Sequence, residues 1–251
     1  MKLLKPIWAD RFPDLVAGQT TRESGVSKSP FSSLNFSVAV GDRPAEVQKN
    51  QTLLMEALGF ETSNLVGGHQ VHGDEIEYAT AGGRHNGCDA FITDRAGLLL
   101  GVTAADCVPI LIADVLQKIV AAAHAGWRGT VANIAAKTVK KLKEDFNSKP
   151  ENCWAFIGAA ICFEDYEVGR EVAEHFRYPF VKKLDKPGKF LVDLKGSNKQ
   201  QLIDEGLPES QIDVCPISTF SRSDLLFSHR AAGGKPTGRG LAFIGYKKAA
   251  A

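Results

Sequence analysis

The middle of the chain contains short, almost uninterrupted apolar runs. The clearest is Ile110-Leu111-Ile112-Ala113, and a second lies between Lys118 and His124. A strand with one face in water alternates apolar and polar residues, whereas an unbroken apolar run is typical of a strand covered on both faces. Covering both faces requires further layers. The sequence therefore predicts an α/β domain with antiparallel hairpins and layered helices.

The expected helices and strands follow an irregular order. Asp42 and Asp193 are candidate helix N-caps, and Gly59 and Gly206 are candidate stops. Helices are expected at residues 42–59, 130–146, 169–176 and 194–205. Strands are expected at residues 75–79, 90–93, 98–104, 109–114, 118–124, 154–158, 189–192, 212–214 and 241–246. This order is neither regular βαβ alternation nor all-β.

Length and charge limit the class of protein. A chain of 251 residues can bury one sizeable core, and no repeat or Pro/Ser-rich linker marks a boundary, so residues 1–247 are expected to form one domain. Residues 248–251 are expected to be a tail, with a composition that fits an expression-vector remnant. The formal charge of +1 provides no general attraction to nucleic acid or to anionic membranes.

Cysteine usage and the N-terminal sequence indicate the compartment. The five cysteines are scattered, odd in number and free of C-x-x-C pairs, which argues against a disulfide framework or a structural zinc ribbon. The first twelve residues lack the apolar segment of a signal peptide, and the apolar stretch 96–105 is about half a membrane span. We therefore expect a soluble cytoplasmic protein with no membrane, nucleic-acid or obligate protein partner.

Two candidate metal ligands follow from a hairpin. If the apolar runs form a hairpin that turns at residues 114–117, Ala113 faces Lys118, and the same register places Cys107 opposite His124. Opposed residues have Cβ atoms about 5 Å apart, so one metal ion could bind both side chains. Pro109 can introduce a bulge that shifts this register.

A third candidate ligand, His72, lies in a glycine-rich segment, Gly67-Gly68-His69-Gln70-Val71-His72-Gly73, which reads as a loop able to approach a ligand closely. Two histidines and one cysteine leave one position of a tetrahedral zinc site open, as catalysis requires. The same residues are also compatible with a buried cysteine and two hydrogen-bonded histidines.

Other polar segments have two interpretations. A predicted strand passes into a predicted helix at His124-Ala125-Gly126-Trp127-Arg128-Gly129. The helix N-terminus and Arg128 could bind an anion. Equally, the glycines could simply form a turn and Arg128 could be a surface charge. Asp89 begins a strand, where it can act as a base, orient another group or simply form a turn. The loop at 20–28 holds Arg22. The basic segment 228–240 is interpreted as a solvated loop.

These motifs resemble the YfiH-like family, also described as laccase-domain or polyphenol oxidases. The matching segments, which cover nearly the whole chain, are Thr21-Arg22, Gly25-Val26-Ser27, Pro30-Phe31, Leu34-Asn35, residues 69–73, Asp89, residues 103–109, residues 124–129 and Thr237-Gly238-Arg239. Ser228-His229-Arg230 is the one departure noted. The resemblance implies stacked mixed β-sheets with outer helices, a layered sandwich similar to the catalytic domain of cytotoxic necrotizing factor toxins. Because that toxin domain uses a Cys–His pair, a nucleophilic Cys107 is an alternative.

The resemblance also implies an activity. It assigns His72, Cys107 and His124 to a zinc ion in a purine nucleoside phosphorylase that also deaminates adenosine. The expected substrates are phosphate and inosine, adenosine, guanosine or methylthioadenosine. Asp89 is then a further catalytic candidate. The candidates for binding substrate or phosphate are Arg22, Asn35, His69 and Arg128.

Two other activities stay open. One is a peptidoglycan-editing hydrolase that removes L-serine from a UDP-muropeptide precursor, using the same zinc site or Cys107. The other is a copper polyphenol oxidase. Six histidines argue against that oxidase, since a multicopper site needs roughly ten. The H-x-E and P-C-x-x-C motifs of the common zinc deaminases are absent, so deamination would need another arrangement.

Overall fold

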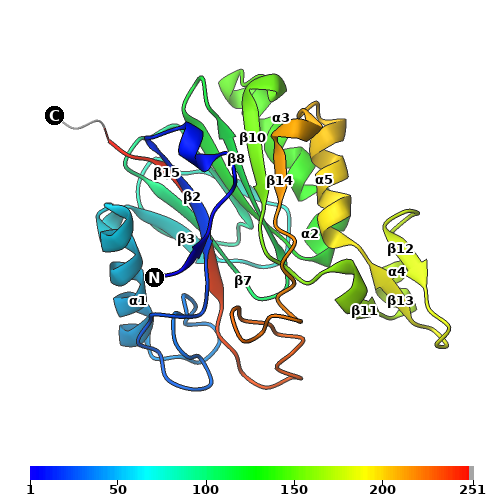
Figure 1. The fold of residues 1–251 in the computed structure, drawn as a ribbon. Coiled ribbons are helices and arrows are strands. Elements are labelled where there is room, and N and C mark those ends of the chain that lie inside the picture. The colour runs from blue at the N-terminus through cyan, green and yellow to red at the C-terminus, as the bar shows by residue number, and fades with distance from the viewer. Residues whose placement is uncertain (249–251) are drawn as a thin grey trace.

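Two stacked β-sheets form the centre of the molecule in the computed structural model, which describes residues 1–248 (Figure 1). The first sheet contains, in spatial order, β1 (Leu3–Leu4), β2 (Leu15–Thr20), β15 (Gly240–Tyr246), β7 (Leu99–Ala104), β3 (Leu65–His69) and β5 (Gly83–Asn86). The second contains β14 (Ile212–Val214), β10 (Cys153–Ile157), β8 (Val108–Asp114), β9 (Ile119–Ala125), β6 (Ala90–Thr93) and β4 (Ile76–Tyr78). Of the predicted tail, residues 249–251 lie outside the described residues.

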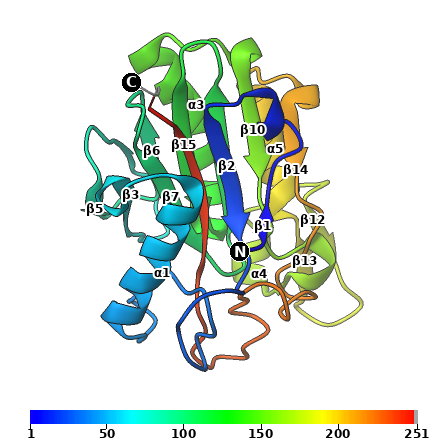
Figure 2. The same ribbon diagram turned by 60° about the vertical axis from the view of Figure 1, so that its left-hand side comes forward.

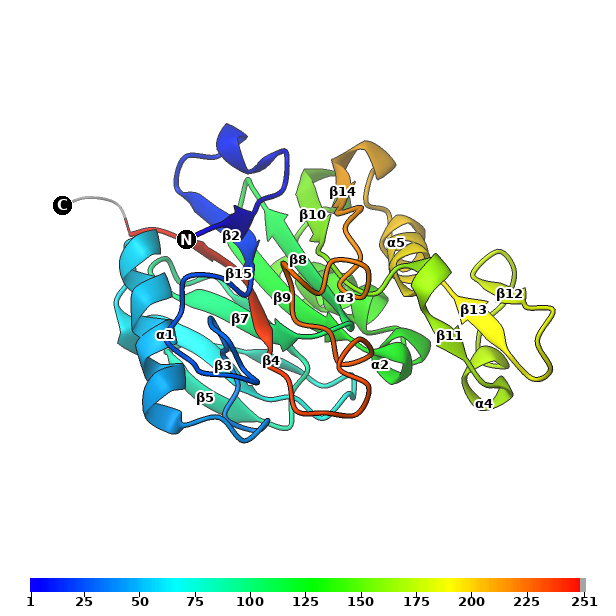
Figure 3. The same ribbon diagram turned by 60° about the horizontal axis from the view of Figure 1, so that its bottom comes forward.

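Helices cover the outer face of each sheet. Helix α1 (Pro44–Leu58) packs on the first sheet, and α3 (Ile134–Phe146) and α5 (Leu194–Asp204) pack on the second (Figure 2). The short helices are α2 (Trp127–Val131) and α4 (Arg170–Ala173). A small sheet of β11 (Glu167–Val168), β13 (Phe190–Val192) and β12 (Val181–Lys183) projects from one side (Figure 3). The predicted stacked mixed sheets with outer helices are confirmed.

Side chains alternate between layers along the buried strands. In β8, Ile110 and Ile112 face α3 and α5, whereas Leu111 and Ala113 lie between the two sheets. Strand β15 alternates in the same way between α1 and the space between the sheets. Successive side chains of a strand point to opposite faces, so a strand in this position must be apolar at every residue.

The helix caps agree with the sequence in part. Asp193 caps α5 by accepting a hydrogen bond from the Gly196 N–H, and Gly59 ends α1 in the left-handed conformation, both as predicted. Asp42 does not cap α1, because Arg43 occupies the N-cap position and the Asp42 carboxylate binds the Asn35 amide instead.

The helix predicted at 130–146 is two helices. Helix α2 ends at Val131, and Asn133, in the left-handed conformation with φ 62°, precedes α3 at Ile134. A residue in that conformation cannot continue a right-handed helix. The predicted extent of the helix at 169–176 is likewise too long, since α4 comprises only Arg170–Ala173.

Glycines hide two strands from the sequence pattern. Gly67, Gly68 and His69, interpreted as a loop, belong to β3, which pairs in parallel with β5. A Cβ added at Gly68 would lie only 1.3 Å from the His85 carbonyl oxygen, so glycine is required where β5 approaches. The other strands that the sequence did not indicate are β1, β2, β11 and β12.

The predicted hairpin exists, but its register was wrong by two residues. Ala113 pairs with Val120 rather than Lys118, and His124 lies opposite Pro109 rather than Cys107. The connection has the predicted four residues but lies one position later, at residues 115–118, and this displacement moves every pairing by two residues. Asp114 fixes the turn there by accepting hydrogen bonds from the backbone N–H groups of Leu116 and Gln117. The ladder runs from Val108 to Asp114 in one register, so Pro109 causes no bulge.

No helix among residues 1–248 is both long and apolar enough to span a bilayer. The extent of the single domain, 1–247, stays a prediction.

Candidate metal centre

Three connections carry the candidate site from one sheet to the other. The parallel strands β3, β5 and β7 of the first sheet end at the same edge, and each chain segment then enters the second sheet as β4, β6 or β8. The crossings are residues 70–75, 87–89 and 105–107. They bring together His72, Asp89 and Cys107. Because β9 is antiparallel to β8, its last residues, including His124, reach the same end.

The three predicted ligands converge. The donor atoms of His72, Cys107 and His124 all lie within 4.8 Å of one another, close enough for this group to bind a metal ion. The two imidazole rings meet edge to face with centroids 4.9 Å apart. His124 is buried and His72 is exposed, so the group lies at the surface of the core with one open side.

The register of the hairpin explains how Cys107 and His124 meet. A shift of two residues preserves the face on which each side chain lies, so the wrong register still predicted the correct face. Continuing the ladder beyond Val108 and Ala125 places Gly126 opposite Cys107. A Cβ at Gly126 would lie 3.2 Å from Cys107 Sγ and 3.0 Å from His72 Cδ2. Glycine at this position therefore leaves room for the ligand group.

If the ligand group binds a metal ion, we expect Gly126→Ala to weaken the binding of added zinc by about tenfold or more. The added methyl group pushes two ligands away from their positions, and about 1.4 kcal/mol of strain suffices for a factor of ten. Competition with a coloured chelator measures this. Gly67→Ala is the control, because its Cβ would meet only the Gly101 carbonyl oxygen, at 3.4 Å. Equal zinc affinity in the two variants would contradict this prediction.

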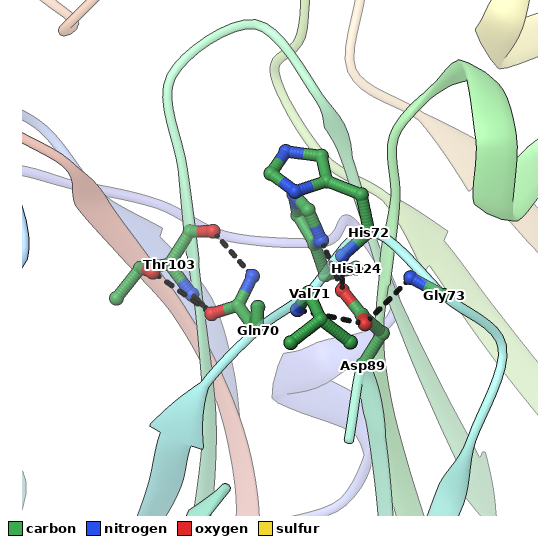
Figure 4. Close-up of polar contacts among 7 residues, drawn as sticks. All are labelled: Gln70, Val71, His72, Gly73, Asp89, Thr103 and His124. Atoms are coloured by element: carbon green, nitrogen blue, oxygen red, sulfur yellow. Dashed lines mark hydrogen bonds and ion pairs between the residues drawn. The ribbon is translucent and has the colours of Figure 1, made fainter. Parts of the chain in front are cut away.

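Asp89 organises two of the ligands. Its fully buried carboxylate accepts hydrogen bonds from the backbone N–H groups of Val71, His72 and Gly73, at 2.8 to 3.1 Å (Figure 4). It also accepts a 2.8 Å bond from His124 Nδ1. Such a bond fixes the tautomer and leaves Nε2 for a metal ion. These contacts are those of an orienting residue, and the role of Asp89 itself stays a prediction.

The charges at the site favour a deprotonated sulfur. Burial alone raises the pKa of the Cys107 thiol, but the charge of His124 and hydrogen bonds from both histidines outweigh it and lower that pKa. Burial likewise raises the pKa of Asp89, and its bonds to His124 and Gly73 reverse the effect. Thiolate and neutral imidazole are the forms that bind metal. A metal cation can therefore replace the proton shared between the Cys107 sulfur and the histidine nitrogens.

Gln70 anchors the loop that carries His72. Its side-chain oxygen accepts hydrogen bonds from the N–H and the hydroxyl of Thr103, both at 2.8 Å, and its nitrogen donates to the Thr103 carbonyl oxygen at 2.9 Å (Figure 4). Thr103 belongs to β7, whose chain continues to Cys107. Two of the crossings are therefore held together beside the ligands.

A cavity of about 490 Å³ opens on the ligand group. The polar and charged residues that line it beyond the ligands are Ser37, Gln51, His69, Gln70, Arg84, Thr103, Asp106, Tyr166, His229, Arg230 and Arg239. Most come from loops that are distant in sequence, and Arg239 immediately precedes β15. The cavity wall thus combines a metal-binding group with several cationic side chains.

None of the three arginines that line the cavity, Arg84, Arg230 and Arg239, forms an ion pair with a carboxylate within residues 1–248. Arg239 Nη1 donates to the carbonyl oxygens of Thr237 and Gly238, and Arg230 Nη1 donates to the Glu167 carbonyl oxygen. Burial lowers the pKa of Arg239, an indication that its charge is poorly solvated. A partly desolvated guanidinium without a counter-ion attracts an anion.

Asp106 joins Arg230 to the ligand group. It precedes Cys107 in a left-handed conformation, with φ 93°. Its carboxylate accepts a 2.6 Å hydrogen bond from the Thr219 hydroxyl and a 2.7 Å bond from the Arg230 N–H. The same residue therefore places Cys107 on one side and Arg230 on the other.

The candidate binding residues fall into two groups. His69 lines the cavity, as a substrate-binding residue should. Arg128 is exposed, stacks on Trp127 and does not line the cavity. Its positive charge is nevertheless close enough to Tyr166 to act on the pKa of that phenol, in the lowering direction. Arg22 also lies outside the lining, because its guanidinium donates to the carbonyl oxygens of Ser32 and Ser223.

Asn35 is buried and does not line the cavity. Its side-chain oxygen accepts the Arg239 N–H at 2.8 Å, so it supports the segment that carries that arginine. The interpretation of 228–240 as a solvated loop agrees with the exposure of most of residues 229–236, but it was wrong at the two ends, where Ser228, Thr237 and Gly238 are buried. Arg239, Arg230 and Tyr166 were missed as site residues. Thr237-Gly238-Arg239 was the available signal, because it was already among the shared motifs.

The fold and the site together define a four-layer α/β protein with a His–Cys–His group at one end of its two sheets. Residues 16–247 match the family model described as "Multi-copper polyphenol oxidoreductase laccase", and the chain belongs to this laccase-domain family, which was the family suggested by its motifs.

Similar proteins are known in bacteria. "Purine nucleoside phosphorylase YlmD" of Geobacillus stearothermophilus is 38% identical over 96% of this chain and 93% of the relative. "Purine nucleoside phosphorylase YfiH" of Escherichia coli is 34% identical over 97% of this chain and 98% of the relative. The crystal structure of the Geobacillus stearothermophilus YlmD superposes with a TM-score of 0.93 at 36% identity, covering 99% of this chain and 97% of that one.

Proposed function

We propose that this protein is a zinc-dependent purine nucleoside phosphorylase. The observation that carries the proposal is the pair of arginines, Arg230 and Arg239, that face the cavity beside His72, Cys107 and His124 without carboxylate partners among the described residues. Phosphorolysis needs an anion site next to the sugar, and this pair supplies one. The names of the relatives support the same activity.

The reaction requires three groups to be held together. Phosphate attacks ribose C1′, the bond from C1′ to the purine breaks, and the purine leaves with the bonding electrons through an oxocarbenium-like state, as in glycoside cleavage. In the proposal, Arg230 and Arg239 orient phosphate on one side of the sugar. A cavity of about 490 Å³ offers space within the size range of small-molecule sites.

Tyr166 is suited to hold the purine or the ribose. Burial raises the pKa of its phenol to about 12, so the hydroxyl keeps its proton and is a hydrogen-bond donor. Arg230 lies over the ring, with its guanidinium carbon 5.2 Å from the ring centroid. His69, which also lines the cavity, offers a second polar group.

The ligand set suits zinc. His72, Cys107 and His124 would hold the ion, and three protein ligands leave a position for substrate. When bound, zinc supplies Lewis-acid polarisation of an oxygen atom. Asp89 keeps His124 oriented, and Gly126 leaves space for the group. The proposal extends to inosine, adenosine, guanosine and methylthioadenosine, and to deamination of adenosine at the same site.

Copper oxidation and muropeptide hydrolysis are the competing activities. The family description implies copper, yet His72, Cys107 and His124 are the one group of three or more close ligands found among residues 1–248. Metal analysis of protein purified without added metal separates zinc from copper. Removal of L-serine from a UDP-muropeptide precursor uses the same open site, so turnover of that precursor is measured beside inosine.

We expect the zinc-loaded protein to release hypoxanthine from inosine only when phosphate is present. Arg239→Met should raise the KM for phosphate by about 10- to 100-fold, the loss expected for one charged hydrogen-bonding contact. Chromatography of hypoxanthine and ribose 1-phosphate provides the measurement. Arg95→Met is the control, since Arg95 pairs with Asp94 away from the cavity. Turnover that is independent of phosphate would reject phosphorolysis.

A further inference from the structure

A lysine is buried outside the candidate metal centre. Lys195, in the first turn of α5, has only 6% of its surface exposed. Its Nζ donates to the carbonyl oxygens of Cys215 at 2.8 Å and Ile217 at 2.9 Å, and to Cys162 Sγ at 3.3 Å. No carboxylate of residues 1–248 forms an ion pair with it.

This placement is unfavourable for stability alone. Burying an amino group away from any carboxylate has a large desolvation cost, and a cation in the first turn opposes the dipole of the helix. Departures of this kind from the usual rules occur at sites that perform chemistry. The unusual partner of Lys195 is the sulfur atom of Cys162.

Cys162 is accessible to small oxidants. The residue is half-buried, and its Sγ can donate to the Pro216 carbonyl oxygen at 3.6 Å while it accepts the bond from Lys195. Thiols beside a lysine and a helix N-terminus, and in reach of solvent, are the ones that oxidise first. The other half-buried free thiol outside the ligand group, Cys88, bonds a Glu77 carboxylate instead.

We propose that Cys162 and Lys195 form a covalent N–O–S bridge when the protein meets hydrogen peroxide. The first peroxide converts the thiol to a sulfenic acid and is reduced to water. In the second step, the sulfenic O–H bond and one lysine N–H bond break, and a bond forms between the sulfenic oxygen and the lysine nitrogen. A second peroxide accepts the two electrons and two protons that this step releases, and it is thereby reduced to two waters. The present N–H···S contact already aligns the two atoms that the oxygen would join.

The bridge would join helix α5 to a segment that lies next to the cavity. Ile161, the neighbour of Cys162, lines the cavity and donates its N–H to the Asp106 carbonyl oxygen at 2.9 Å. Lys195 belongs to α5, on the outer face of the second sheet. The inference does not depend on the proposed function, because its readout is a mass and not an activity.

The test is peptide mapping of the zinc-loaded protein before and after hydrogen peroxide treatment. We expect a linked pair of peptides that contain Cys162 and Lys195, with one oxygen gained and two hydrogens lost relative to the reduced pair. Dithiothreitol should abolish it. Cys162→Ser and Lys195→Met should each lack the linked pair. The control is Lys199→Met, which should retain it, because Lys199 lies on the same helix as Lys195 but pairs with Glu209.

Other products would overturn the proposal. They are a disulfide between Cys162 and Cys215, oxidation of Cys162 that leaves Lys195 unmodified, and a linked product that forms equally at Cys88. Should Lys195→Met fail to fold, Cys162→Ser alone decides, since serine retains the size and the hydrogen-bonding capacity of the position. The linked mass must then be present in the parent protein and absent from this variant.

Discussion

If the proposed function is correct, replacing His124 by alanine should remove the bound zinc and lower inosine phosphorolysis by about 10³-fold. The imidazole is buried, one nitrogen is committed to Asp89, and the other faces Cys107 and His72, so no neighbouring side chain can substitute for it. Loss of a metal ion that contributes several kcal/mol of electrostatic stabilisation corresponds to a factor of this size. Metal content by mass spectrometry and kcat/KM for inosine measure the two effects.

The matched control is His175→Ala. His175 stacks on Trp127 with centroids 5.8 Å apart and does not line the cavity. This variant should retain stoichiometric zinc and near-parental turnover. If His124→Ala still binds zinc with parental affinity, the assignment of His124 as a ligand is wrong, and a Cys107 nucleophile would be the remaining use of the group.

Replacing Asp89 by asparagine should weaken zinc binding by about 10- to 100-fold, as is usual when the partner of a metal-binding histidine is changed. The carboxylate accepts three backbone N–H groups and one imidazole N–H. An amide has one oxygen, so its NH₂ group must face some of these donors. The loop that holds His72 and the orientation of His124 are then disturbed together. Zinc titration in a competing chelator provides the affinity.

Restored activity at high zinc separates an orienting role from a directly catalytic one. Asp89→Asn should recover most of its turnover when zinc is raised to saturation, because the ligands themselves are unchanged. Asp94→Asn is the control, since Asp94 binds the Tyr78 hydroxyl at the surface. Persistent inactivity of Asp89→Asn with zinc fully bound would instead assign Asp89 to the chemical step.

Much of the fold could be predicted because it depends on local patterns. The buried strands of the second sheet are apolar at nearly every position, and the caps at Gly59 and Asp193 rely on interactions within a few residues. The strands that were missed, including β3 and β5, contain glycine or polar residues that only the neighbouring strand explains. Likewise, a single left-handed residue, Asn133, divides the predicted second helix.

The site was predictable to different depths. Residue chemistry and the alternation of side chains along the hairpin were enough to identify His72, Cys107 and His124. A register error of two residues leaves each side chain on the same face of the sheet, so it did not affect this prediction. Arg22 and Asn35 resembled binding residues, yet their polar groups serve the loops around them. Arg230 and Tyr166 carried no local signal, because their importance comes from the cavity that they share.

The sequence by itself determined the layered α/β class, the apolar strands and the three residues able to bind a metal ion. Only the tertiary structure decided that three crossings between the sheets meet at one end, that Asp89 holds two of them, and that Arg239 faces the ligands. The physical reason is distance along the chain. Helix periodicity, strand alternation and caps act between near neighbours, whereas a cavity exists only when segments far apart in sequence are packed against each other.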